Sequence, residues 1–196
     1  MSALKQRLAK ISSQGHQFLG VIFALPLLIS ATTGIAHRLG RSWFGLSKDF
    51  GRAMMTLHEG RYLGEWGVPL YVLVIGLGLL GIIATGLGLL WGRSLPGQWS
   101  ARRLHHLLAG AAALPLLVSA TTGIAYRLGR NWFGLSKEQA AIFLSLHQGS
   151  YWGEVGRSFY VLLVGLSLLT LLATGVSMLT ILRRLPHWRS RVTPET

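Results

Sequence analysis

Apolar residues along this chain gather in four long runs, which polar connections separate. The runs cover about 17–36, 68–91, 107–126 and 159–182, and none of them contains Asp, Glu, Lys or Arg. As a helix, each run is long enough to cross a hydrocarbon core of about 30 Å. The pattern therefore predicts an all-α membrane protein with four transmembrane helices.

The chain also repeats itself with an offset of 89 residues. Residues 25–48 return almost letter for letter as 114–137, with differences at three positions. The correspondence extends outward to His16 with His105, Pro26 with Pro115, His58 with His147, Glu65 with Glu154, and Thr85-Gly86 with Thr174-Gly175. We therefore interpret 1–196 as a single membrane domain made of two tandem two-helix repeats, about 16–93 and about 105–182.

A shorter helical pattern follows the first and the third apolar run. Ser136-Lys-Glu-Gln139 is a capping-box signature, and Ser47 occupies the equivalent place in the first repeat. The apolar residues that follow recur on one helical face in both copies: Phe50, Ala53, Met54 and Leu57, then Ile142, Phe143 and Leu146. We expect short amphipathic helices in the membrane interface over about 48–57 and 137–146.

The basic residues indicate the orientation of the chain. The net charge is +13, but the basic side chains stand at the ends of the runs and form no single patch, which argues against nucleic acid as a partner. Three groups border the apolar runs: Lys5, Arg7 and Lys10; Arg93, Arg102 and Arg103; and Arg183, Arg184, Arg189 and Arg191. By the positive-inside rule, we expect both termini and the short middle connection in the cytoplasm, and membrane lipid around the spans.

Two repeated pairs of histidines carry the candidate chemistry. An approximate two-fold axis along the membrane normal would place His16 opposite His105 near the cytoplasmic side, and His58 opposite His147 near the outer side. Two imidazoles that face each other across a helical bundle can supply both axial ligands of a haem iron. We therefore predict two haem b groups. The chain has no cysteine, which excludes covalent c-type haem, disulfides and iron–sulfur clusters.

Alternatives remain for several of these residues. Histidines at an interface can also cap helices or reach to the membrane surface, and repeated sequence can be kept by inheritance alone. His106, which corresponds to Gln17, is the alternative to His105 as a ligand. His37 has no counterpart and is interpreted as an interfacial polar residue, and His187 as solvated. Arg38 and Arg127 lie at span ends, where they can bind haem propionates or phospholipid headgroups.

Glycines are frequent in the apolar runs, which has two interpretations. Small residues allow helices to approach closely, and they also make room for a flat cofactor. Gly20 and Ala109 stand one turn after His16 and His105 on the same helical face. We expect open space beside these two imidazoles.

A family resemblance rests on short motifs that cover nearly the whole chain. They are His16-x3-Gly20-x5-Pro26, Ala31-Thr-Thr-Gly34, Leu57-His58-Glu-Gly60, and Thr85-Gly86-x4-Trp91, and the second repeat lacks the terminal Trp. With these motifs the chain resembles the PepSY-associated transmembrane family, which is similar to iron and siderophore reductases of the bacterial inner membrane. The resemblance implies a haem-bearing core that carries electrons across that membrane. The connection over 38–65 has no room for the extracytoplasmic PepSY domain that family members typically carry.

Two classes of function follow. The first is a dihaem membrane cytochrome, acting as a ferric or siderophore reductase-like oxidoreductase or as an electron-transfer subunit. The sequence shows no flavin, nicotinamide or nucleotide motif, so its electrons would come from a quinol or a redox partner protein. The second class is a non-catalytic subunit that assembles or stabilises a larger membrane complex. It includes pigment-binding proteins, since histidine also ligates chlorophyll.

Overall fold

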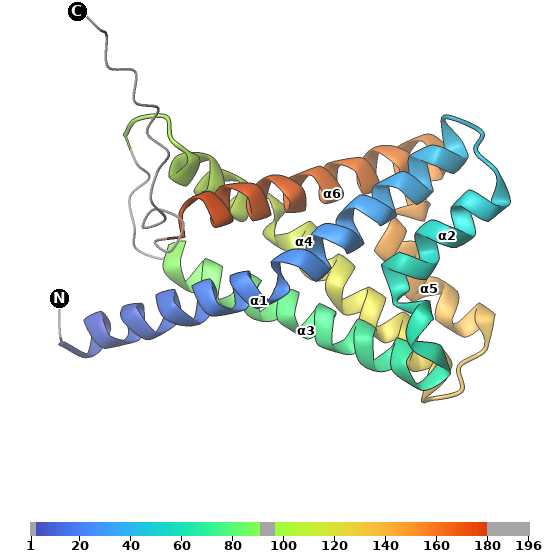
Figure 1. Cartoon of the computed structure of the whole chain (residues 1–196), viewed down its shortest axis with the longest axis horizontal. Helices are drawn as coiled ribbons and strands as arrows, with labels where there is room; N and C mark the ends of the chain where they lie inside the picture. The colour runs from blue at the N-terminus through green and yellow to red at the C-terminus, as the bar shows by residue number, and fades with distance from the viewer. Residues whose placement is uncertain (1–2, 91–96, 180–196) are drawn as a thin grey trace, which may run out of the picture.

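The computed structural model describes residues 3–90 and 97–179, and this part of the chain is helical without a strand (Figure 1). Four of its helices are long and apolar enough to cross a membrane, which confirms the predicted fold class. They are α1 (Ala3–Ser42), α3 (Gly64–Leu90), α4 (Ala101–Asn131) and α6 (Gly153–Ser177). Each long helix begins before the apolar run that predicted it. An apolar run identifies the segment that can lie in hydrocarbon, whereas the helix itself continues into polar sequence.

Several residues used in the sequence analysis lie outside the described part of the chain. They are Trp91, Arg93, Arg183, Arg184, His187, Arg189 and Arg191, together with the side chains of Lys5, Arg7 and Lys10.

The two repeats interlock in one bundle. Helix α1 packs against α3 of its own repeat and against α6 of the other repeat, while α4 packs against α6 and α3. Helices α1 and α4 therefore stand diagonally across the bundle and face its centre (Figure 1). Residues that correspond in the two repeats are thereby brought opposite each other.

Large apolar side chains cover the outside of this bundle. Phe18, Leu25, Leu114 and Leu163 are each about two-thirds exposed on the isolated chain. So much apolar surface on every long helix is unfavourable in water and favourable in hydrocarbon. The chain is a multi-pass membrane protein whose outer surface contacts lipid.

Two short helices confirm the predicted amphipathic segments. Helix α2 (Lys48–Glu59) packs on α1, and α5 (Lys137–Gln148) packs on α4. The Ser47 hydroxyl caps α2 by accepting from the Phe50 amide, and Ser136 forms the predicted capping box with Gln139. Each helix runs two residues beyond the predicted end.

Glycines then turn the chain toward the next long helix. Gly60 and Gly149 end α2 and α5 with φ of 69° and 67°, in the left-handed region that favours glycine. The single turns η1 (Arg61–Leu63) and η2 (Ser150–Trp152) follow and lead into α3 and α6. This ending places His58 and His147 in the last turn of the short helices.

Candidate functional site

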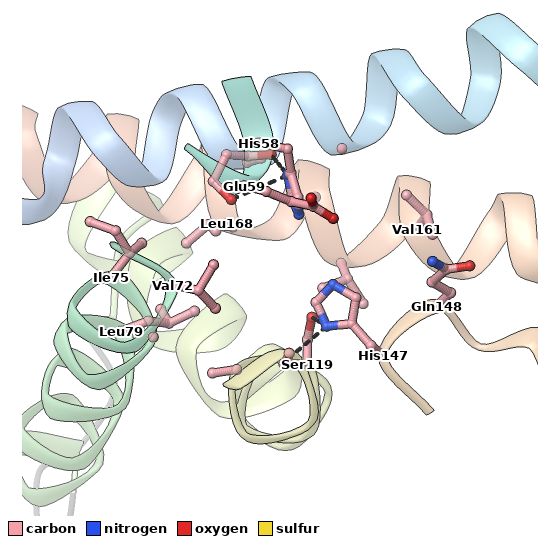
Figure 2. A pocket seen from close by; sticks show the side chains of 18 of the residues that line it. His58, Glu59, Val72, Ile75, Leu79, Ser119, His147, Gln148, Val161 and Leu168 are labelled. Atoms are coloured by element: carbon pink, nitrogen blue, oxygen red, sulfur yellow. Dashed lines mark hydrogen bonds between the residues drawn. The ribbon is translucent and has the colours of Figure 1, made fainter. Parts of the chain in front are cut away.

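Two cavities lie in the bundle, one above the other. Cavity A, of about 890 Å³, is lined by His16 and His105. Cavity B, of about 380 Å³, is lined by His58 and His147 and is drawn in Figure 2. Both volumes fall in the range of about 300–1,000 Å³ that is typical of cofactor sites.

Each cavity contains one histidine from each repeat. The ring centroids of His16 and His105 are 6.3 Å apart, and those of His58 and His147 are 6.4 Å apart. An iron held between two opposed imidazoles, with bonds of about 2 Å, separates the ring centroids by about 6.3 Å, because each centroid lies about 1.1 Å behind its nitrogen. The spacing in both cavities therefore fits a six-coordinate haem iron. It is His105, the predicted residue, whose ring pairs with His16, although His106 also lines cavity A.

In cavity B, hydrogen bonds to the main chain fix both imidazoles. Nδ1 of His58 lies 2.8 Å from the carbonyl oxygen of Ser30, and Nδ1 of His147 lies 2.8 Å from that of Ser119 (Figure 2). A carbonyl oxygen only accepts, so each Nδ1 carries the proton and donates it. Nε2 then keeps its lone pair, which is the tautomer that a metal requires.

The protein also favours the neutral form of these two imidazoles. Burial lowers the pKa of His58 below its usual value, and burial, with a smaller contribution from His58, lowers the pKa of His147 to about 4. Both imidazoles are therefore uncharged at neutral pH. A neutral pair of imidazoles can share one ligand without charge repulsion.

In cavity A, threonine hydroxyls take the place of the serine carbonyls. Nδ1 of His16 lies 3.0 Å from Oγ1 of Thr85 and 3.1 Å from the carbonyl oxygen of Ile82, while Nδ1 of His105 lies 2.9 Å from Oγ1 of Thr174. Each threonine hydroxyl donates its own proton to a carbonyl one turn earlier in its helix. The hydroxyl oxygen is therefore an acceptor for the imidazole, and Nε2 again keeps its lone pair.

A glycine lies beside each of the four imidazoles. A Cβ placed at Gly34, Gly86, Gly123 or Gly175 would lie 3.1–3.4 Å from a ring atom of His58, His16, His147 or His105, respectively. Gly34, Gly86 and Gly123 each stand four residues after the carbonyl that their histidine contacts, so the missing side chain opens that carbonyl to the imidazole. Other glycines serve helix packing, such as Gly76 against Ile124. Close helix packing is thus confirmed for some glycines, and others make room for the imidazoles, while room for a flat cofactor stays a prediction.

The expected space beside the cavity A imidazoles is present. A Cβ at Gly20 would meet no atom within 4 Å, and Gly20 and Ala109 both line cavity A. The open volume therefore begins one helical turn from His16 and His105.

Four leucines separate the two cavities. Leu27, Leu79, Leu116 and Leu168 line both cavities, and they form two pairs that the repeat offset relates. Leu27 and Leu116 are almost completely buried, at 2% and 3% exposure. We call these four residues the leucine layer. From His16 to Ser30, α1 advances by about 21 Å, so the imidazole pairs stand roughly 20 Å apart along the bundle.

The two predicted arginines pair with carboxylates of the opposite repeat. Arg38 binds Glu154 at 2.7 Å and donates to the Ser158 hydroxyl, and Arg127 binds Glu59 at 2.5 Å. Both arginines line cavity B. His37 is not part of an imidazole pair: its Nδ1 lies 3.1 Å from the carbonyl oxygen of Gly51, where it ties α1 to α2.

No protein-family model, curated protein or solved structure matches this chain. The resemblance to the PepSY-associated transmembrane family therefore stays a prediction. Within the described residues, no group of three or more His, Cys, Asp or Glu side chains could hold a metal ion. Haem is compatible with this finding, because the porphyrin supplies four ligands and the protein needs to supply only two.

The sequence analysis missed the residues that support the imidazoles. A signal for them exists: a Thr-Gly dipeptide occurs once in each long helix, at 33–34, 85–86, 122–123 and 174–175. Each of these glycines faces a histidine of another helix. Arg157, which also lines cavity B, was missed as well, because its counterpart in the first repeat is Val68.

Proposed function

We propose that this chain is a dihaem b-type membrane cytochrome that moves electrons across the membrane. It acts either as a reductase-like protein or as the electron-transfer subunit of a larger membrane complex. When bound, a b-type haem supplies an iron that takes up and releases one electron at a time. The proposal includes the resemblance to the PepSY-associated transmembrane family and a location in the bacterial inner membrane, with both termini in the cytoplasm. A quinol or a redox partner protein is the proposed electron donor.

One observation carries the proposal. Two imidazole pairs, each shared between the repeats, have ring centroids 6.3 and 6.4 Å apart across a cavity. In every one of the four imidazoles Nδ1 is held by an oxygen acceptor of a neighbouring helix. Metal-binding histidines have this second-shell arrangement, since it fixes the tautomer and orients the ring. Plain helix packing requires neither the fixed tautomer nor the open space between the rings.

The remaining residues of the two sites have supporting roles. Arg38 and Arg127 are cations beside cavity B and the proposed candidates for propionate partners. Arg127 is neutralised by Glu59, which also lines the cavity, so Arg38 is the better placed of the two. The leucine layer is apolar, so it keeps water and ions from passing between the cavities while the cofactors on either side stay close. Two sites about 20 Å apart would cover most of a hydrocarbon core about 30 Å thick.

The direct test is the cofactor content of the purified chain. A pyridine haemochrome assay with reduced-minus-oxidised spectra should give two non-covalent b-type haems per chain. His16→Ala or His105→Ala should empty cavity A, or leave its haem high-spin, and spare cavity B. His58→Ala or His147→Ala should do the reverse. His37→Ala is the matched control: His37 also lines cavity B but belongs to no imidazole pair and bonds to the main chain of α2, so the variant should keep both haems.

Several outcomes would contradict the proposal. A colourless preparation from haem-replete cells would favour the assembly subunit, and a chlorophyll spectrum would favour the pigment-binding protein. If His16→Ala and His58→Ala perturbed the same haem while His105→Ala left it unchanged, the pairing between repeats would be wrong.

A further inference from the structure

The rim of cavity B breaks the two-fold symmetry of the bundle. The repeats differ in charge at two positions of this rim: Glu59 corresponds to Gln148, and Arg157 corresponds to Val68, which does not itself line the cavity. Arg38 and Arg127, by contrast, are equivalent and present in both halves. The same scaffold therefore offers two edges of different charge to whatever occupies the cavity.

One edge is neutral. Arg127 binds Glu59 at 2.5 Å, and their side chains are only 16% and 13% exposed. Glu59 also accepts from Arg61, which is half-exposed and does not line the cavity. A carboxylate that approached this edge would meet the Glu59 carboxylate, and the repulsion between the two would be strong in a partly buried place.

The other edge is cationic. It carries Arg38 and Arg157, with the neutral Gln148 at the position equivalent to Glu59. The acidic neighbour of these arginines is Glu154, whose side chain is 80% exposed and lies outside the cavity lining. An exposed carboxylate is screened by solvent and offsets little of the charge that faces the cavity.

Polar groups at the cationic edge have unused hydrogen-bonding capacity. Nε of Arg157 and Oε1 of Gln148 are buried without a hydrogen-bond partner among the described residues. Nε of Arg127 at the neutral edge also lacks one, but the guanidinium of Arg127 is bound to Glu59, whereas that of Arg157 has no such close carboxylate. The guanidinium of Arg157 is 3.7 Å from the Glu154 carboxylate, too far for a hydrogen bond. Buried polar groups without partners are rare, because their lost hydration is not replaced. A ligand carboxylate at this edge would bond to the guanidinium, and the Gln148 amide can turn its NH₂ toward it.

We propose that Arg157, with Arg38 and Gln148, binds the carboxylates of the cofactor in cavity B and thereby selects one of its two orientations. The proposal rests on the proposed haem function. Both propionates of haem b extend from one edge of the macrocycle, so a symmetric cavity would accept the ligand in two equivalent directions. Here the propionate edge turns toward Arg157 and away from Glu59.

The test exchanges the two edges. Arg157→Val with Gln148→Glu gives the second repeat the residues of the first, and Val68→Arg with Glu59→Gln does the opposite. All variants are made in the full-length His16→Ala/His105→Ala chain, in which cavity B alone keeps its imidazole pair. Two readouts are used: the relative affinity for haem and for its uncharged dimethyl ester, and the ¹H NMR shifts of the haem methyl groups, which distinguish the two orientations. Arg52→Glu, at an exposed arginine outside the cavity, changes the net charge by the same two units as Arg157→Val/Gln148→Glu and is the control for charge.

The parent chain should prefer haem over its ester and show one dominant set of methyl resonances. Arg157→Val/Gln148→Glu should reduce that preference about tenfold or more and give two sets, because two charge-assisted contacts are lost. Adding Val68→Arg/Glu59→Gln should restore the preference and reverse the dominant orientation. An unchanged preference and a single unchanged set of resonances in Arg157→Val/Gln148→Glu would overturn this inference alone. A parent chain that binds no haem would overturn the proposed function together with it.

Discussion

The threonines of cavity A provide a sharp test of the second shell. Thr85 and Thr174 accept hydrogen bonds from Nδ1 of His16 and His105, whereas the histidines of cavity B use main-chain carbonyls. Replacing both threonines with valine keeps the shape of the side chain and removes the acceptor. We therefore expect Thr85→Val/Thr174→Val to weaken haem binding in cavity A and to leave cavity B unchanged.

The contacts of each histidine set the expected magnitude. Loss of a second-shell partner typically lowers metal affinity about 10- to 100-fold, which corresponds to roughly 1.4–2.8 kcal/mol. Thr85→Val alone should fall at or below the low end, because His16 keeps the carbonyl of Ile82 at 3.1 Å. Thr174→Val alone should have a similarly small effect: it removes a hydrogen bond of 2.9 Å, but His105 keeps a hydrogen bond to the backbone of Leu171, the equivalent of Ile82.

The chain offers a matched control in Thr33→Val/Thr122→Val. These two threonines are buried to a similar degree as Thr174 and donate to carbonyls of their own helices, but they accept no hydrogen bond from a histidine among the described residues. The assay is haem titration of the full-length chain, with the two sites distinguished by the spectra of the His16→Ala and His58→Ala variants. Equal losses of haem in the control and in Thr85→Val/Thr174→Val would refute the reasoning, because the effect would then come from helix stability.

Two further predictions concern the shape of the cavities. Gly34→Leu or Gly123→Leu should displace an imidazole and lower the haem content of cavity B. Gly110→Leu is the control and should keep both haems, because a Cβ at Gly110 would meet no atom within 4 Å. Retention of haem in the first two variants would contradict this prediction. Leu27→Ala/Leu116→Ala should join the cavities, lower the free energy of unfolding by about 2–5 kcal/mol per site and raise the proton permeability of vesicles that contain the protein. Thermal unfolding measures the loss of stability, and a pH dye trapped in the vesicles measures the permeability. Unchanged values would mean that the leucine layer is not a barrier.

Much of the fold could be predicted, because its signals are local or repeated. Uninterrupted apolar runs identify the four long helices, and Ser136 with Gln139 marks the start of a short one. The pairing of His16 with His105 follows from the offset of the repeats, without any contact being known. Duplication thus supplies long-range information that a single sequence normally lacks.

The support of the imidazoles could not be predicted in the same way. His58 and His147 donate to main-chain oxygens, and a carbonyl leaves no mark in a sequence because every residue has one. The ion pair of Arg38 with Glu154 joins residues 116 apart, and only the packing of α1 against α6 brings them together. Arg157 is not shared between the repeats, so it is missed when only identical residues are compared. Comparing the repeats for differences in charge identifies it, because its counterpart is Val68.

Most of the charge differences between the repeats favour the second repeat in both cavities. A duplicated bundle starts with equal edges, and each later change of charge distinguishes them. In cavity B the second repeat has Arg157 where the first has Val68, and in cavity A it has Arg102 and His106 in place of Ser13 and Gln17. The shared residues hold the imidazole pairs, which must match across the axis. Apart from His37, which corresponds to Tyr126, the lining residues named here that differ add basic groups to the second repeat. A surplus of cations on one side is what the proposed binding of an anionic ligand in one fixed direction needs.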